Sequence, residues 1–174
     1  AALAVSSATD AMLVGLATLG IGPGDEVITT PMTFCSTVHV IEHLGARPVL
    51  VDVEPDTLNL DPALVERAVT ERTRALMPVH LYGHPCEMDA LLEIAGRHGL
   101  HVVEDAAHAL PAAYRGRTIG TLGTLTAFSF YATKNLTTAE GGMLAGDPET
   151  IDRARIWSLH GMSRDAYQRY SAAG

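Results

Sequence analysis

Residues 87–105 have the sequence EMDALLEIAGRHGLHVVED, in which a helix pattern is followed directly by a strand pattern. In the first part, Leu91, Leu92 and Ala95 fall on one helical face, and Gly99 is typical of a helix stop. The second part, HVVED, is a short β-branched run that ends in two carboxylates. This stretch therefore predicts one helix–strand unit of an α/β fold.

The same alternation continues along the chain. Further strand patterns occupy residues 26–30, 47–53, 74–81, 125–131 and 142–146, and helix patterns occupy 35–45, 62–69 and 148–160. Strands that alternate with helices favour a three-layer α/β/α fold with a mostly parallel sheet. Ligands of such sheets collect at the carboxyl ends of the strands, which are here residues 31–34, 105–108 and 129–134.

Composition restricts the class of protein. The 174 residues are 47% apolar and 18% charged, a globular composition, and suffice for one domain. A net charge of −8 gives no support for nucleic-acid binding, and no apolar run is long enough for a membrane span. Cys35 and Cys86 lie far apart, which argues against a disulfide framework and fits a reducing cytoplasm.

One lysine interrupts the stretch FSFYATKNLTTAEGG, residues 128–142. By itself Lys134 is most simply a solvated surface charge. Glu104 and Asp105 leave the sheet at the end of a buried strand, where a carboxylate needs a cation or several N–H donors. Asp105 is therefore either a helix N-cap or the counter-ion of a positive ligand group.

Small hydroxyl residues mark a strand-to-helix passage in VSSATDAM, residues 5–12. The N–H groups of a helix N-terminus, with the hydroxyls of Ser7 and Thr9, suit a phosphate, and the same residues suit plain N-capping. Ser129 could donate to the same anion or pack in the core.

Histidine patterns raise the alternative of a metal site. The stretch HVIEH, residues 39–43, matches a zinc-peptidase pattern, but no third ligand stands out and the segment is explained as a helix that covers the sheet. His80, His84 and Cys86 have ligand-like spacing around a turn, where a loop contact explains them equally well. We therefore expect no metal.

Taken in order, these pieces resemble one known family. The chain is similar to the DegT-type sugar aminotransferases, fold-type-I enzymes that use pyridoxal 5′-phosphate (PLP), through VSSATDAM, GIGPGDEVITTPMTF, GARPVLVDVEPDTLNLD, VHLYGHPCEMD, VVEDAAHA, IGTLGTLTAFSFYATKNLTTAEGG and LHGMSRD. The resemblance covers nearly the whole chain.

The resemblance implies a role for each matching residue. Lys134 matches the lysine that forms a Schiff base with PLP, and Asp105 matches the aspartate that pairs with the pyridinium nitrogen. His108 matches the residue near the phenolic oxygen of the cofactor. The other matches are Phe34, which would stack on the ring, and Ala8, Thr9 and Ser129, which would hold the phosphate.

The resemblance also implies a reaction. An amino group would pass from an amino acid, glutamate or glutamine, to a keto group of a nucleotide-linked sugar or a cyclitol. Related dehydratases carry histidine at the position of Lys134, so the lysine favours amino transfer. The alternatives are a non-catalytic regulatory or binding protein of the same fold and, from the HVIEH pattern, a zinc hydrolase.

Family proteins are longer than this chain. We therefore expect residues 1–174 to be part of a PLP-binding large domain, with an N-terminal segment and a small C-terminal domain absent. The resemblance implies a homodimer in which the second subunit contributes to the site, including an asparagine beyond Gly174, so the 174-residue piece alone can lack activity. Ala8 replaces the usual glycine, which predicts a loop less able to adopt positive φ. Leu110 and Pro111 replace a glycine-containing turn.

Overall fold

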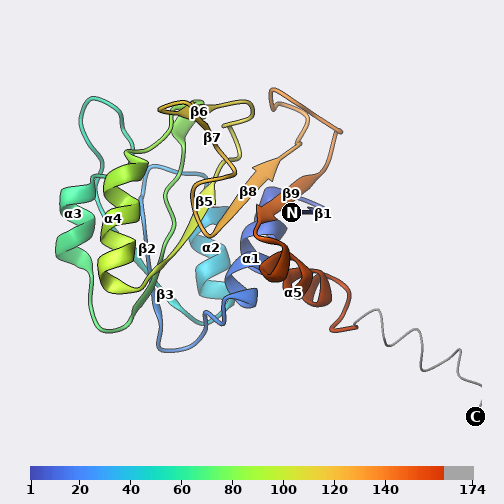
Figure 1. The fold of residues 1–174 in the computed structure, drawn as a ribbon, viewed down its shortest axis with the longest axis horizontal. Helices are drawn as coiled ribbons and strands as arrows, with labels where there is room; N and C mark the ends of the chain where they lie inside the picture. Colours follow the sequence, from blue (N-terminus) through green and yellow to red (C-terminus); the bar gives the residue numbers. More distant parts are fainter. Residues whose placement is uncertain (163–174) are drawn as a thin grey trace, which may run out of the picture.

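The structure, a computed structural model, describes residues 1–162. Residues 163–174 lie outside this range, and so do the last three residues of the LHGMSRD motif. Figure 1 shows a central twisted sheet with helices on both faces. The sheet has seven strands in the order β1-β9-β8-β5-β4-β2-β3. These strands are β1 (Ala2–Val5), β2 (Glu26–Thr29), β3 (Arg47–Leu50), β4 (Thr73–Leu76), β5 (His101–Asp105), β8 (Leu125–Ser129) and β9 (Gly142–Gly146).

The strand pairing confirms the predicted mostly parallel sheet. The pairs β2–β3, β2–β4, β4–β5 and β5–β8 are parallel, whereas β9 runs antiparallel to both β8 and β1. The parallel strands therefore end at one edge of the sheet. Asp105 lies at that edge at the end of β5, and Ser129 lies there at the end of β8.

Five α-helices within residues 1–162 cover the sheet, and local interactions determine where they begin and end. They are α1 (Ala8–Thr18), α2 (Ser36–His43), α3 (Pro62–Ala68), α4 (Met88–His98) and α5 (Pro148–Ser158). As the sequence predicts, the Asp61 carboxylate caps α3 by accepting from the Ala63 N–H at 2.8 Å. Gly99 ends α4 in the left-handed conformation, φ 65°, which costs glycine little because it has no Cβ.

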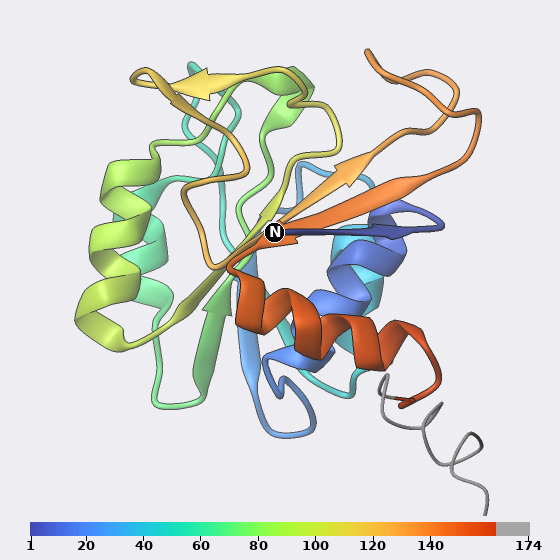
Figure 2. The same cartoon turned by 45° about the vertical axis from the view of Figure 1, so that its right-hand side comes forward.

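Two apolar cores confirm the three layers. Figure 2 shows α3 and α4 on one side of the sheet and α1, α2 and α5 on the other. The core under α1, α2 and α5 includes Met12, Leu16, Ile41, Leu125, Leu144 and Ile151, and the core under α3 and α4 includes Ile28, Leu76, Met88, Leu91, Val102 and Phe128. Burying each large side chain contributes about 1.5–3 kcal/mol, so the sheet, which provides residues to both cores, is a rigid platform. No helix within residues 1–162 has the length and apolar character that a membrane crossing requires.

Three strands are shorter than the sequence patterns predicted by two residues or more. The predicted strand 47–53 ends at Leu50, although Val51 still donates to Thr29 O, because Val53 turns away to bridge Leu60. The predicted strand 74–81 begins at Thr73 and ends at Leu76, and Pro78 beyond it has no N–H to extend the ladder. The predicted strand 125–131 ends at Ser129, where the chain leaves the sheet.

Two elements have no counterpart in the predicted pattern. A hairpin of two-residue strands, β6 (Ala113–Tyr114) and β7 (Arg117–Thr118), covers the second core, and a single 3-10 turn, η1 (Leu81–Gly83), follows β4. Both are too short to produce a hydrophobic period. The loop between β8 and β9, which carries Lys134, extends beyond the end of the sheet in Figures 1 and 2.

Candidate active site

Asp105 is the fixed point of the candidate site. Its side chain is buried, with 4% of the residue exposed, and its backbone N–H donates to Pro78 O at 2.9 Å. The Thr37 hydroxyl donates to Oδ2 at 2.8 Å, and the N–H of Ala107 donates to Oδ1 at 3.1 Å. The expectation of a helix N-cap was wrong, because turns and not a helix follow Asp105, and the counter-ion role stays a prediction.

Lys134 lies in the loop between β8 and β9. Phe130 anchors this loop, since its N–H donates to Gly141 O at 2.8 Å and its carbonyl accepts from the N–H of Thr138 at 2.9 Å. The Lys134 side chain is half-buried, and within residues 1–162 no carboxylate lies within the 4.0 Å of an ion pair. Desolvation lowers the pKa of Lys134, while the charge of Asp105 raises it. The charge of Asp105 therefore acts on Lys134, although the two side chains form no ion pair.

His108 belongs to the same cluster. Burial lowers the pKa of its imidazole, the charge of Lys134 lowers it further, and the charge of Asp105 raises it. The ring stacks on Tyr82, with centroids 5.8 Å apart and an interplanar angle of 3°. The charges of Lys134 and Asp105 therefore both act on His108, and the catalytic roles of Asp105, His108 and Lys134 stay predictions.

The N-terminus of α1 meets the ends of β8 and β9. Ser7 caps the helix by accepting from the N–H of Asp10 at 3.1 Å, which leaves the N–H groups of Ala8 and Thr9 without a partner among residues 1–162. Gly142 pairs with Ser129 in the sheet, and a Cβ on Gly142 would stand 2.7 Å from the Ala8 nitrogen. Ala8, Thr9 and Ser129 are therefore neighbours at one edge of the sheet.

Ala8 adopts a helical conformation as the first residue of α1, and it is not among the residues with positive φ. The position requires no left-handed backbone, so the reduced ability of alanine to adopt positive φ has no consequence in this conformation. The substitution of Leu110 and Pro111 for a glycine-containing turn produces a cis peptide bond. The carbonyl of Leu110 accepts from the Asn135 side-chain amide at 3.3 Å, which ties this turn to the loop of Lys134.

Phe34 precedes α2 and is 76% exposed. Its chain position is three residues before Thr37, which donates to Asp105. The structure thus leaves the Phe34 ring exposed, on the segment that leads into α2 and to the Thr37 hydroxyl that contacts Asp105. The exposed large side chains on segments around the cluster are Met32, Phe34, Tyr82, Tyr131 and Leu136.

Sequence reasoning missed the buried network next to Asp105. Glu104 accepts from the N–H of Gly123, from the Thr126 hydroxyl and from His80 Nε2, each at 2.8 Å. The Glu104 carboxylate is fully buried, and the protein supplies the hydrogen bonds that a buried carboxylate requires. Two adjacent carboxylates at a strand end were a sequence signal, but only the fold shows that Glu104 faces the interior of the protein.

The histidine patterns do not assemble a metal site. Within residues 1–162, no group of three or more His, Cys, Asp or Glu side chains could hold an ion. His39 and His43 lie on α2 with ring centroids 6.3 Å apart. Burial raises the pKa of the Cys86 thiol to about 12, and the thiol donates to Val79 O at 3.2 Å.

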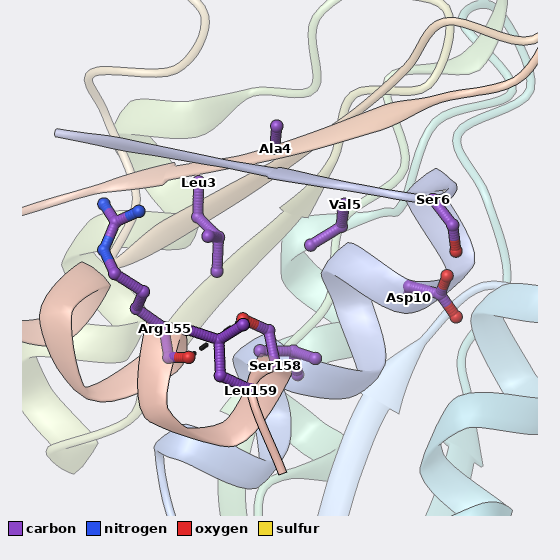
Figure 3. A pocket seen from close by; sticks show the side chains of 9 residues that line it. Leu3, Ala4, Val5, Ser6, Asp10, Arg155, Ser158 and Leu159 are labelled. Atoms are coloured by element: carbon purple, nitrogen blue, oxygen red, sulfur yellow. Dashed lines mark hydrogen bonds between the residues drawn. The ribbon is translucent and has the colours of Figure 1, made fainter. Parts of the chain in front are cut away.

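A separate cavity of about 640 Å³ lies between β1, α1 and α5. Figure 3 shows Asp10 on α1 and Arg155 on α5 on different sides of it, with Leu3 and Val5 of β1 pointing inward. Asp105, His108 and Lys134 are not part of its lining. We therefore place the candidate site at the carboxyl edge of the sheet, where the titratable groups gather.

Comparison with known proteins decides the family. A model of the DegT/DnrJ/EryC1/StrS aminotransferase family matches residues 1–174. The chain belongs to this family. Its members are aminotransferases that depend on PLP, and one relative of the same fold has been solved in a PLP form and in a pyridoxamine phosphate (PMP) form.

Individual family members match at high identity. Spore coat polysaccharide biosynthesis protein SpsC of Bacillus subtilis (strain 168) is 56% identical over 174 residues, which are 99% of this chain and 45% of SpsC. DesV of S. venezuelae, solved in complex with a ketimine intermediate, is 53% identical with a TM-score of 0.90, over 95% of this chain and 45% of DesV. DesI, solved in the presence of its TDP-sugar product, is 41% identical with a TM-score of 0.89, over 95% of this chain and 42% of DesI. The chain therefore spans a little under half the length of these family members.

The residues at the carboxyl edge fit the cofactor of the family. The N–H groups of Ala8 and Thr9 and the Ser129 hydroxyl are donors suited to a phosphate, and Gly142 lets β9 pass close to the backbone of Ser7 and Ala8. The Asp105 carboxylate suits a protonated ring nitrogen, and Lys134 supplies an amine with a lowered pKa. This donor set matches an anionic phosphate, a cationic ring and an aldehyde.

Proposed function

We propose that the full-length protein is a PLP-dependent aminotransferase. It moves an amino group from glutamate or glutamine to a keto group of a nucleotide-linked sugar or a cyclitol. The observation that carries the proposal is a half-buried Lys134, whose pKa is lowered by desolvation and which feels the charge of a buried, hydrogen-bonded Asp105. The family membership and the relatives in polysaccharide and TDP-sugar chemistry support the class of acceptor.

Lys134 would hold the cofactor covalently. An amine is nucleophilic only when it is neutral, and desolvation lowers the pKa of Lys134 in the required direction. Once it is released from the cofactor, Nζ of Lys134 can carry a proton from and to the α-carbon of the amino donor. The charge of Lys134 acts on His108, which would contact the oxygen substituent of the ring in this proposal.

Asp105 would keep the ring nitrogen protonated. PLP, when bound, supplies an electron sink that depends on this proton. The hydrogen bonds from Thr37 and Ala107 hold the carboxylate in place before any ligand arrives. Phe34 would cover one face of the ring, and Ala8, Thr9 and Ser129 would bind the phosphate.

The rest of the protein completes the site in this proposal. Residues 1–174 form part of the large domain, and the remainder of the full-length protein includes a small C-terminal domain. We infer a homodimer in which the partner subunit closes the site, because Phe34, Tyr131 and Leu136 are exposed on segments around it.

A substrate screen tests this function. The full-length protein is incubated with PLP, glutamate or glutamine, and a panel of keto-sugar nucleotides and keto-cyclitols, and donor consumption is measured. We expect consumption with one class of acceptor and none in Lys134→Ala. PLP binding without turnover on any acceptor would contradict the catalytic proposal and favour a binding or regulatory role. A protein that takes up zinc but no PLP would contradict the cofactor.

A further inference from the structure

The turn η1 (Leu81–Gly83) holds a bulky residue in an unusual conformation. Tyr82 has φ 50° and ψ 25°, in the left-handed region that large side chains rarely adopt. Gly83 follows with φ 85°. Such a conformation persists only where the surroundings over-determine it, and it occurs most often at functional sites.

Asn59 fastens both ends of the turn. Its Oδ1 accepts from the Leu81 N–H at 3.2 Å, and its Nδ2 donates to His84 O at 3.0 Å and to Pro85 O at 3.2 Å. Asn59 is itself 1% exposed, so its own position is fixed by packing. The turn is therefore held across its full length by one buried amide.

His80 fastens the turn to β5. Its backbone N–H donates to Asp105 O at 3.0 Å, and its Nε2 lies 2.8 Å from Glu104 Oε2. The N–H of Cys86 donates to His80 Nδ1 at 3.2 Å, so the ring proton is on Nε2 and is donated to Glu104. The buried Glu104 network thus connects the turn to the strand that carries Asp105.

The anchored turn packs against His108. The Tyr82 ring lies parallel to the imidazole, with centroids 5.8 Å apart, and a Cβ on Gly83 would stand 2.8 Å from His108 O. Tyr82 is 85% exposed, so burial of its ring does not explain why the left-handed backbone is maintained. The stack on His108 is the contact that the turn produces.

We propose that Tyr82 is a positioning residue that fixes the orientation of the His108 imidazole toward the bound cofactor. The inference rests on the proposed function, because His108 has a ligand to face only if PLP binds. Offset-stacked aromatic rings at this separation attract one another and restrict rotation. The ring of Tyr82, and not its hydroxyl, performs this role.

The first test measures the stack itself. Histidine ring resonances are recorded by NMR in the full-length protein labelled at histidine, and His108 is assigned by the signal lost in His108→Gln. Tyr82→Asn removes the ring but tolerates a left-handed backbone, whereas Tyr82→Phe keeps the ring. We expect the His108 resonance to change position in Tyr82→Asn and to stay in place in Tyr82→Phe. Leu58→Asn is the matched control, because Leu58 also has a positive φ of 58° and makes no stack. An unmoved resonance in Tyr82→Asn would overturn the proposal.

The second test measures the consequence for the cofactor. PLP is titrated into the cofactor-free full-length protein and its variants. We expect Tyr82→Asn to weaken PLP binding about threefold to tenfold, and Tyr82→Phe and Leu58→Asn to leave it unchanged. A shifted His108 resonance with unchanged PLP affinity would overturn the positioning role. Absence of PLP binding by the unaltered protein would instead overturn the proposed function, and the NMR result would still report whether the stack exists.

Discussion

The hydroxyl of Thr37 donates a 2.8 Å hydrogen bond to Oδ2 of Asp105, across 68 residues of sequence. The Thr33 and Thr37 hydroxyls lie 2.7 Å apart, so Thr33 donates to the Thr37 oxygen while Thr37 donates to the carboxylate. This chain of hydroxyls orients the carboxylate from α2, whereas the backbone holds it from β5. In the proposed site, the alignment of Asp105 with a ring nitrogen depends on both contacts.

Replacing Thr37 with valine tests this alignment. The variant keeps the shape of the buried side chain but leaves Oδ2 of Asp105 without its donor. We expect PLP affinity to fall about tenfold or more, since a hydrogen bond to a charged group contributes about 1.5–3 kcal/mol. The matched control is Thr37→Ser, which retains the hydroxyl and should retain most of the affinity. Equal PLP affinity in the two variants would show that the hydroxyl does not orient Asp105.

Gly142 controls the approach of β9 to the N-terminus of α1. In Gly142→Ala, the new Cβ would stand 2.3 Å from the Ser7 carbonyl carbon, so the helix N-terminus must move. We expect PLP affinity to drop more than tenfold, as measured by titration. Gly96→Ala in α4 meets no atom within 4 Å and should be neutral or slightly stabilising. A Gly142→Ala protein that binds PLP normally would place the phosphate elsewhere.

The Glu104 network contributes to stability. Glu104→Ala removes the acceptor of two buried donors, on Thr126 and His80, and of a partly buried donor on Gly123, and leaves all three without a partner. We expect the free energy of unfolding to fall by about 3 kcal/mol or more in denaturant titrations. Glu93→Ala removes a carboxylate whose side chain is 70% exposed, and it should change stability by less than about 1 kcal/mol. Similar losses in both variants would contradict the interpretation of Glu104.

The lowered pKa of Lys134 predicts how the rate of PLP capture depends on pH. Desolvation lowers this pKa from the ordinary value of 10.5, so a larger share of the amine is neutral at a given pH. We expect the rate of PLP capture, trapped with borohydride at each pH, to rise with a midpoint below 10.5. The charge of Asp105 raises the pKa of Lys134, so Asp105→Asn should move the midpoint still lower. A midpoint at or above 10.5 in the unaltered protein would contradict the desolvated setting.

Local signals in the sequence were sufficient for most of the fold. The Gly99 stop, the Asp61 cap and the carboxylate end of β5 lie where the patterns predicted, because each depends on neighbouring residues. The predicted strand extended past the end of β4, because Pro78 and Val79 continue the apolar run of the sequence but do not continue the strand. The β6–β7 hairpin was not predicted, because strands of two residues are too short to show an alternating hydrophobic pattern.

The site was predictable only in part. Asp105, His108 and Lys134 come together because parallel strands and their loops meet at one edge, which the fold class already implied. The contact of Thr37 with Asp105 and the stack of Tyr82 on His108 join distant segments, and no local pattern specifies them. The left-handed backbone of Tyr82 is likewise imposed by Asn59 and His80, which lie outside the turn.

The central claim is that PLP binds at the carboxyl edge of the sheet, with its aldehyde on Lys134. The most direct measurement is borohydride reduction of the full-length protein with PLP, followed by proteolysis and mass analysis of the labelled peptide. The account predicts a phosphopyridoxyl group on the peptide that contains Lys134, the single lysine of these 174 residues. A label on a lysine elsewhere in the full-length protein, or no label at all, would contradict it.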